Sequence, residues 1–201
     1  MKLRQLEIQL QKIKGFDRPD ASFEQYMTPA TLAARMLFHA NMNGDIEGAR
    51  VCDLGCGTGM LAVGAALLGA EVTAVDFDSA ALAVARENAE AFDVEITFIE
   101  HRIGGAVPLE ITADTVVMNP PFGAQKEHAD RPFIDTALAI APTCYGIFNA
   151  GSIPFLSAYT KGRAKMVEKI AASLVIPRQF AFHTKDSLEI PVEIVHLERI
   201  E

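Results

Sequence analysis

The chain is poor in cysteine and has no histidine pattern of the kind that binds metal. Three of its 201 residues are cysteines (Cys52, Cys56 and Cys144), and none belongs to a Cys-x-x-Cys pair. The five histidines show no metal-ligand spacing either. We therefore expect neither a disulfide framework nor a metal site, and we expect a reducing compartment, the cytoplasm.

Long apolar runs are also lacking. Residues 1–16 are charged throughout and contain no continuous apolar stretch typical of a leader. Residues 136–160 carry no charge, but prolines and glycines interrupt them, whereas a membrane span needs about 20 mostly apolar residues. We read this stretch as a buried strand plus loops and expect no membrane association.

Positive charge is in deficit: 18 Lys and Arg face 26 Asp and Glu, for a net charge of −8. Such a chain does not coat a nucleic acid through its overall charge, so contact with RNA would need a local basic patch or a partner. The best local patch lies on a basic helix that we expect over residues 161–173. Its cations are Lys161, Arg163, Lys165 and Lys169. A plain solvated helix face explains them equally well.

What the chain does have is hydrophobic periodicity, with half of its residues hydrophobic. Apolar residues at helical spacing predict an amphipathic helix from residue 3 to near Gly15, and a second helix covers residues 32–41. Strands and helices then alternate. The expected strands are 50–54, 71–75, 96–99, 115–118 and 144–148, and the expected helices are 60–68, 79–92 with Ser79 as N-cap, and 133–140. This order predicts an α/β fold with a mostly parallel sheet and helices on both faces.

The tail contains two extended stretches, residues 178–183 and 189–198, which predict an antiparallel hairpin at the sheet edge. No linker or repeat is visible. We therefore divide the chain into an N-terminal helical extension (1–48) that covers cofactor and substrate, and one α/β domain (49–201).

The first chemical motif is the glycine turn Asp53-Leu54-Gly55-Cys56-Gly57-Thr58-Gly59, which follows a strand and opens a helix. Asp76 ends the next strand about 20 residues later, where a carboxylate binds ribose hydroxyls. This spacing fits both NAD and S-adenosylmethionine. The latter is favoured because position 60 is Met rather than a third glycine, and because Asp53 would repel a pyrophosphate but suits a cationic amine.

The second motif is Asn119-Pro120-Pro121-Phe122, directly after a strand. The two prolines fix the backbone and remove two donors, which leaves carbonyl acceptors next to the Asn119 amide oxygen. Together these oxygens can hold a planar amino group by its N–H bonds, while Phe122 stacks on the ring that carries it. A rigid turn with a core Phe is the alternative.

Both motifs together resemble class I S-adenosylmethionine-dependent methyltransferases that modify an exocyclic or amide nitrogen. Glu24-Gln25-Tyr26-Met27-Thr28, the stretch 33–37, and Asp130 with Phe133 narrow the resemblance. The chain is most similar to the archaeal and eukaryotic small-subunit rRNA adenine-N6 methyltransferases, over essentially its whole length. The resemblance implies a Rossmann-like fold, S-adenosylmethionine as cofactor and ribosomal RNA as substrate. It also implies a small zinc-binding activator subunit as partner.

The resemblance also assigns residues. Catalysis and target binding fall to Asn119, Pro120, Pro121 and Phe122. The expected cofactor-binding residues are Gln25, Tyr26, Thr28, Asp53, Gly55, Gly57, Thr58, Met60, Asp76 and Glu100, with Gln25 and Thr28 at the methionine end. Further substrate contacts are expected from Phe133, Lys161, Arg163 and His183.

This chain departs from the family in two places. Glu100-His101-Arg102 stands where an Asp contacts the cofactor adenine, and Asn149-Ala150 replaces a basic His-Lys pair.

Alternatives remain open from the sequence. The same chemistry would serve a protein glutamine amide or a guanine amine, and a weakly catalytic RNA-associated module would retain cofactor binding alone. Residues 123–131 after the catalytic motif are interpreted as a mobile lid or as an ordinary loop.

The expected reaction is a direct in-line methyl transfer to an adenine that has left any base stack, without a dedicated His base.

Overall fold

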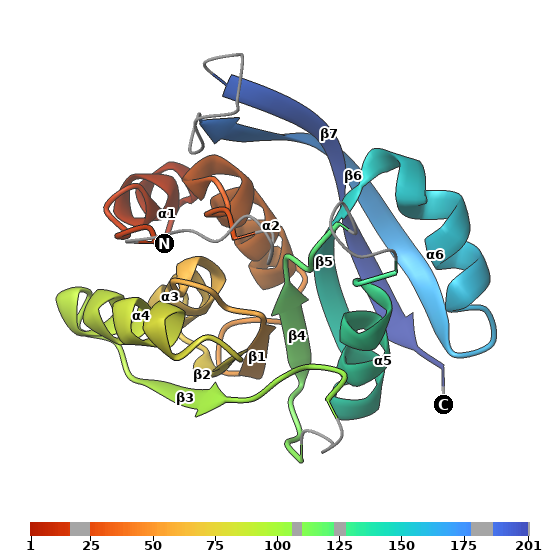
Figure 1. Cartoon of the computed structure of the whole chain (residues 1–201), viewed down its shortest axis with the longest axis horizontal. Helices are drawn as coiled ribbons and strands as arrows, with labels where there is room; N and C mark the ends of the chain where they lie inside the picture. Colours follow the sequence, from red (N-terminus) through yellow and green to blue (C-terminus); the bar gives the residue numbers. More distant parts are fainter. Residues whose placement is uncertain (17–24, 106–109, 123–127, 178–186, 201) are drawn as a thin grey trace.

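The structure is a computed structural model that describes residues 1–16, 25–105, 110–122, 128–177 and 187–200. A seven-stranded sheet in the order β3-β2-β1-β4-β5-β7-β6 forms its centre (Figure 1). The strands are β1 (Arg50–Leu54), β2 (Glu71–Asp76), β3 (Ile96–Glu100), β4 (Thr115–Met118), β5 (Thr143–Asn149), β6 (Ala164–Pro177) and β7 (Ser187–Arg199). The helices are α1 (Leu3–Leu10), α2 (Ala30–Met42), α3 (Met60–Leu67), α4 (Ser79–Ala91), α5 (Arg131–Ile140) and α6 (Ile153–Tyr159), with a 3₁₀ turn η2 (Ala150–Ser152).

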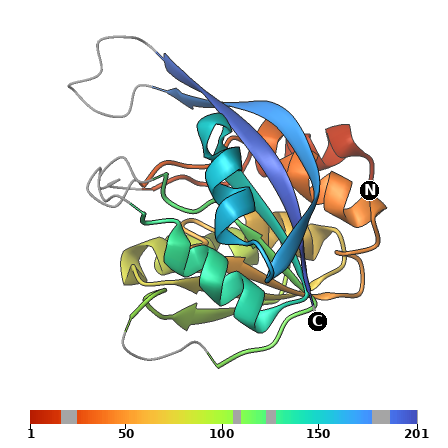
Figure 2. The same cartoon turned by 90° about the vertical axis from the view of Figure 1, so that its right-hand side faces the viewer.

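Strands β1 to β5 run parallel, and β7 is antiparallel to both β5 and β6. The sequence therefore predicted the α/β class, the parallel sheet and the antiparallel edge correctly. Helices lie on both faces: α1 to α4 on one side, α5 and α6 on the other (Figures 1 and 2). No helix in the described ranges is long and apolar enough to cross a bilayer.

Each sheet face has its own buried core. On one face, residues from α1, α2 and α3 pack on β1, β2, β5 and β7, with Leu6, Met36 and Leu61 fully or almost fully buried. On the other face, Ile134 of α5 and Leu156 of α6 pack on β4, β5 and β7. Helices α1 and α2 therefore share the first core with the sheet.

Several expected boundaries were wrong. α1 ends at Leu10, five residues before Gly15, although Ile13 remains buried beyond the helix. α4 is capped by Asp78, whose side chain accepts a 2.9 Å hydrogen bond from the Ala80 N–H, and not by Ser79. Helix α6 was missed because Pro154 was read as a loop residue, whereas it occupies the first turn of the helix, where proline is tolerated.

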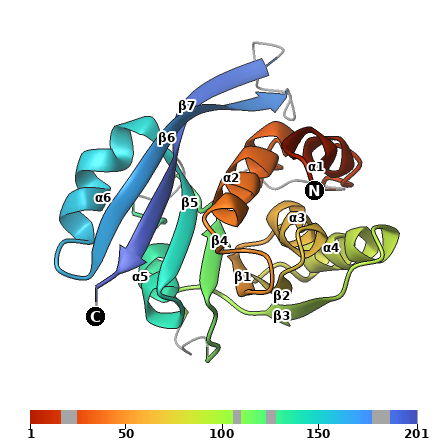
Figure 3. The same ribbon diagram turned by 180° about the vertical axis from the view of Figure 1, so that it is seen from behind.

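The expected basic helix over 161–173 is instead strand β6. Lysines at helical spacing suggested a helix, but Ile170, Ala172 and Leu174 alternate inward with period two and pair with β7. A bulge between Met166 and Glu168 interrupts the pairing. Seen from behind, the hairpin extends well past α2 (Figure 3). The expected stretch 178–183 lies outside the described residues, and β6 is the partner of β7.

Candidate active site

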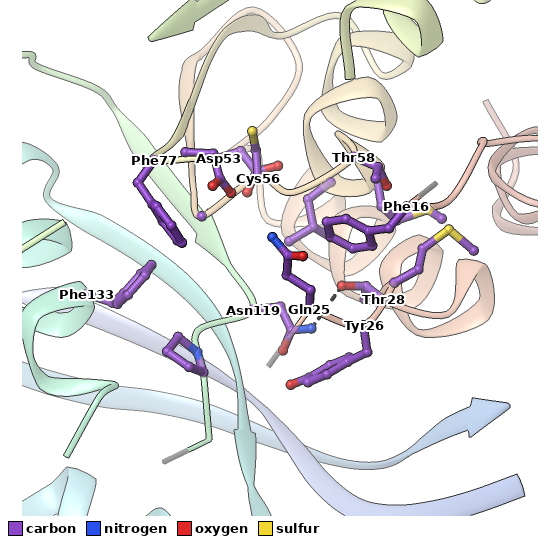
Figure 4. A pocket seen from close by; sticks show the side chains of 16 residues that line it. Phe16, Gln25, Tyr26, Thr28, Asp53, Cys56, Thr58, Phe77, Asn119 and Phe133 are labelled. Carbon is purple, nitrogen blue, oxygen red and sulfur yellow. Dashed lines mark hydrogen bonds between the residues drawn. The ribbon is translucent and has the colours of Figure 1, made fainter. Parts of the chain in front are cut away.

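A pocket opens at the carboxyl ends of β1, β2 and β4 (Figure 4). Its walls come from the glycine turn, from the ends of the two neighbouring strands and from the segment that precedes α2. Its lining residues are Phe16, Gln25, Tyr26, Met27, Thr28, Asp53, Gly55, Cys56, Thr58, Met60, Leu61, Asp76, Phe77, Asn119, Pro121 and Phe133. The two predicted motifs therefore meet at one site.

The glycine turn is held by backbone hydrogen bonds and needs its glycines. The N–H groups of Gly55 and Cys56 both donate to the Val75 carbonyl of β2, at 2.8 and 3.0 Å. Gly55 has φ +72°, and a β-carbon there would lie 2.8 Å from Cε1 of Phe133. Gly59, at φ +86°, precedes α3, and a β-carbon there would lie 3.2 Å from Cβ of Ala85 in α4. The turn therefore requires glycine both for its conformation and for close packing.

Asp53 at the end of β1 is the most deeply buried acid in the pocket wall, at 1% exposure. Its Oδ2 accepts a 2.9 Å hydrogen bond from the Ala62 N–H in α3, while Oδ1 has no partner among the described residues. Burial, together with the neighbouring Asp76 charge, raises the pKa of the Asp53 carboxyl to about 8. The site thus offers an unsatisfied acid that a cationic group would complement.

Asp76 at the end of β2 faces the same pocket. Its Oδ2 accepts from the Gly57 N–H at 2.8 Å and its Oδ1 from the Asp78 N–H at 3.0 Å. Burial raises its pKa, and the two backbone hydrogen bonds oppose that rise. Each oxygen keeps a second lone pair, so this carboxylate can accept from ribose hydroxyls while it holds the glycine turn in place.

Asn119 follows β4 and has a fixed orientation. Its Nδ2 donates to Thr28 Oγ1 at 2.9 Å, the dashed bond in Figure 4. Its Oδ1 is buried and makes no hydrogen bond within the part of the chain that the structure describes. Of the neighbouring residues, Pro120 is buried, Pro121 lines the pocket, and Phe122 packs against Tyr26 with ring centroids 5.9 Å apart. The buried amide oxygen therefore presents an acceptor to a ligand.

The N-terminal extension covers one side of the pocket. The Phe16 ring lies 2.9 Å from where a β-carbon at Gly57 would be, and it stands opposite Phe77 and Phe133 in Figure 4. Gln25 Nε2 donates to Asp78 Oδ2 at 2.6 Å, which ties the segment before α2 to the cap of α4. Gln25 is thus bonded next to Asp76, the expected ribose side.

Asn88 of α4 joins the extension to the glycine turn. It is 3% exposed; its Nδ2 donates to the Thr58 carbonyl at 2.9 Å and to the Lys14 carbonyl at 3.0 Å, and its Oδ1 accepts the Lys14 N–H at 2.9 Å. Thr58 lines the pocket, and Phe16, two residues after Lys14, covers it. One buried amide therefore sets the position of the cover relative to the turn.

Some predicted residues are not brought to the pocket. Glu100 pairs with Asp76 across β3 and β2 but is exposed and does not line the pocket. Lys161 and Arg163 precede β6, whose first residue pairs with Arg199 next to the start of β5, so they lie at the opposite edge of the sheet. His183 lies outside the described residues.

Other residues were missed by sequence reasoning. Phe77 follows Asp76 directly, so its place in the chain was a signal; Arg102 covers one of its ring faces at 4.2 Å. Phe16 and Asn88 carried no such signal in the sequence, because their contacts depend on tertiary packing.

Within the described residues, no cluster of His, Cys, Asp or Glu is arranged to hold a metal ion.

Comparison with known proteins agrees with this geometry. Residues 32–142 match the family described as "Methyltransferase small domain". An uncharacterized protein of Methanocaldococcus jannaschii is 36% identical over all of this chain and 95% of the relative. The zebrafish (Danio rerio) protein named rRNA N(6)-adenosine-methyltransferase METTL5 is 34% identical over 97% of this chain and 98% of the relative. A crystal structure of a candidate RNA methyltransferase from Pyrococcus horikoshii superposes with a TM-score of 0.92 at 36% identity, over 100% of this chain and 99% of the other.

The fold and the pocket define an S-adenosylmethionine-dependent methyltransferase. More particularly, the chain belongs to the family of the rRNA N(6)-adenosine-methyltransferases, which it matches in zebrafish, fly and worm over at least 96% of its length. The pocket residues fit the cofactor on structural grounds. The unpartnered Asp53 oxygen suits the amine of its methionine part, the Asp76 carboxylate suits ribose hydroxyls, and the Phe77 ring suits a flat base.

Replacing Asp53 tests its role in cofactor binding and its effect on stability in two separate measurements. Asp53→Asn keeps an acceptor for the Ala62 N–H but removes the charge, so we expect the dissociation constant for S-adenosylmethionine to rise at least tenfold. In the unfolded wild-type chain, the Asp53 carboxyl ionises once the pH exceeds the ordinary pKa of an aspartate. In the folded, cofactor-free protein the same carboxyl stays protonated to about pH 8. Wild-type stability from this group is therefore fully present below pH 4 and is lost as the pH rises to about 8.

The variant lacks this loss, so its melting temperature should gain on that of the wild type between pH 5 and pH 8. Calorimetry gives the affinity, and thermal unfolding at several pH values gives the stability. Asp114→Asn, which alters an exposed acid paired with Arg50, is the control and should leave cofactor affinity unchanged. Unaltered affinity in Asp53→Asn would contradict the assignment.

Asn88→Ala removes three hydrogen bonds and should lower the free energy of unfolding by about 2–3 kcal/mol. Because Asn88 joins the segment that contains Phe16 to the glycine turn, we also expect its loss to lower cofactor affinity about tenfold, measured by calorimetry. Lys14→Ala is the matched control, since it removes the exposed ion pair with Glu87 but keeps the backbone bonds to Asn88. Equal cofactor affinity in wild type and Asn88→Ala would mean that the anchor does not position the cover.

Proposed function

We propose that this chain transfers the methyl group of S-adenosylmethionine to the N6 amine of an adenine in small-subunit ribosomal RNA. The observation that carries the proposal is the Asn119 amide, whose nitrogen is held by Thr28 and whose buried oxygen lacks a partner in the described ranges. The unpartnered amide oxygen can accept an N–H from a bound amine. The names of the whole-length relatives support adenine in rRNA as the bearer of that amine.

The chain's own residues would bind and orient the amine. Asn119 Oδ1 and the Pro120 carbonyl would accept its two N–H bonds, which leaves the nitrogen lone pair directed at the pocket. Phe122 and Tyr26 lie beside this turn and provide aromatic faces for the base. When bound, the cofactor supplies a methyl group already activated by a sulfonium centre. The surplus proton of the amine leaves to solvent, so the site needs no buried base.

The proposal extends to the role of the N-terminal extension. Residues 1–48 would cover the bound cofactor and the target base, since Phe16 and the Gln25–Thr28 segment line the pocket. It also places the reaction in the cytoplasm, in keeping with three buried cysteines that are all free thiols.

A small zinc-binding activator subunit completes the proposal. Strand β3 ends the described sheet on one side, and its Ile96, Phe98 and Ile99 side chains are only half-buried. An uncovered edge with apolar side chains suits strand addition by a partner. We expect co-expression with such a subunit to raise the melting temperature of the chain by several degrees. A melting temperature and yield equal to those of the chain alone would argue against this partner.

The reaction is tested with labelled S-adenosylmethionine and small-subunit rRNA from cells that lack this protein, followed by digestion to nucleosides. Wild-type protein should place label in N6-methyladenosine. Asn119→Ala should lower the turnover number at least a hundredfold while cofactor affinity changes less than about twofold, because the amide contacts the amine and not the cofactor. Thr28→Val, which frees the amide to rotate, should cost roughly tenfold.

Label in a glutamine side chain or in another nucleoside would keep the methyltransferase and reject the adenine substrate. Loss of cofactor binding in Asn119→Ala would show that the amide holds the cofactor instead.

A further inference from the structure

A second group of side chains stands at the same edge of the sheet, on the far side of Asn119 from the cofactor residues. α5 and α6 follow the carboxyl ends of β4 and β5, so their first residues lie at the ligand edge. The aromatic–arginine cluster begins there and consists of His128, Arg131, Phe155 and Tyr159. The cofactor acids belong to β1 and β2, on the other side of β4 (Figure 1). The cluster therefore lies on the opposite side of β4 from the two cofactor acids.

The rings of the cluster form a ladder. His128 stacks on Phe155 with centroids 6.5 Å apart and an interplanar angle of 19°, and Phe155 stacks on Tyr159 at 5.2 Å and 25°. The Arg131 guanidinium lies over both Phe155 and Tyr159, at 5.1 and 5.4 Å from their centroids. His128 is exposed and the other three side chains are half-buried. A stack of flat groups that reaches the surface can be extended by a base.

Arg131 is also a cation without an acceptor. Its guanidinium makes no hydrogen bond or ion pair with any residue that the structure describes, and its buried Nε has no partner. The nearest acid, Asp130, has its pKa raised by burial, although the charge of Arg131 opposes that rise. Arg163, which lies over the Tyr159 ring, already has an acid partner: it donates to Asp135 at 2.7 Å and to the Tyr159 carbonyl at 2.9 Å. Arg131 therefore retains the capacity to pair with an anion.

We infer that the aromatic–arginine cluster binds the single-stranded RNA next to the target adenine, with Arg131 on a phosphate and a flanking base on the exposed end of the ladder. This inference rests on the proposed function. A guanidinium pre-set flat against rings suits both roles, because it can pair bidentately with phosphate and present a planar face to a base.

The test compares two charge removals. Arg131→Ala and Lys161→Ala each delete one cation, one beside the catalytic turn and one at the opposite edge of the sheet. The probes are small-subunit rRNA and a short single-stranded oligonucleotide that spans the methylated adenine. In Arg131→Ala the dissociation constant for both RNAs should rise about tenfold. The slope of its logarithm against log salt should fall by about 0.7, the value for one phosphate contact in a single strand. Lys161→Ala should bind like the wild type.

Two further measurements distinguish binding from folding. Cofactor affinity should stay within about twofold of wild type in Arg131→Ala, because the cluster does not line the cofactor pocket. Arg131→Lys keeps the charge but not the planar stack, so it should retain the salt slope and still lose affinity. If Arg131→Ala folds poorly, Arg131→Gln, which keeps a planar amide over the rings, takes its place with the same expected loss of slope.

Wild-type RNA affinity and salt slope in Arg131→Ala, or in Arg131→Gln where it takes its place, would overturn the inference and leave the proposed function standing. If the wild-type protein itself neither binds nor methylates the RNA while still binding cofactor, the proposed function fails and the inference fails with it.

Discussion

The arrangement of this molecule depends on the reversal of strand order at β1. The chain winds outward from β1 to β2 and β3, and then returns to place β4 on the other side of β1. The connections on the two sides leave in opposite directions, so the carboxyl ends of β1 and β4 border an open crevice. Both chemical motifs stand at this point: the glycine turn follows β1 and the Asn119 turn follows β4. Neither motif forms a site by itself.

Burial and backbone hydrogen bonds act in opposite directions on the two acids of the crevice. Asp53 and Asp76 end adjacent strands and are both buried, and burial raises the pKa of each carboxyl because it penalises the ionised form. Backbone donors offset part of that cost, from Ala62 to Asp53 and from Gly57 to Asp76. The remainder is relieved only when a ligand brings a positive group and hydroxyl donors. A well-hydrogen-bonded apolar turn would be more stable in the free protein, but it would bind no cationic cofactor.

The sequence predicted what depends on local pattern. The glycine turn, the strand ends that carry Asp53 and Asp76, and the Asn119 turn lie within short stretches whose strand and turn chemistry agree. The sequence did not predict the features that depend on contacts between segments far apart in the chain. β6 carries lysines at helical spacing, yet it becomes a strand because it pairs with β7 along most of its length and its Leu174 is buried. Phe16 and Asn88 meet the glycine turn only after α1, α3 and α4 have packed, so no local signal marks them.

An acidic chain can bind RNA only through cations that its own acids leave available. Several cations in the described ranges are paired or remote: Arg50 pairs with Asp114, Arg163 with Asp135, and Lys161 lies at the edge away from the pocket. The overall field therefore does not attract a polyanion. Recognition must come from a few oriented groups. Arg131 is one of them, because its guanidinium lies over the rings of Phe155 and Tyr159 and forms no ion pair with a described acid. Stacking and one oriented charge select an unpaired strand, which is also the form in which an adenine amine can reach Asn119.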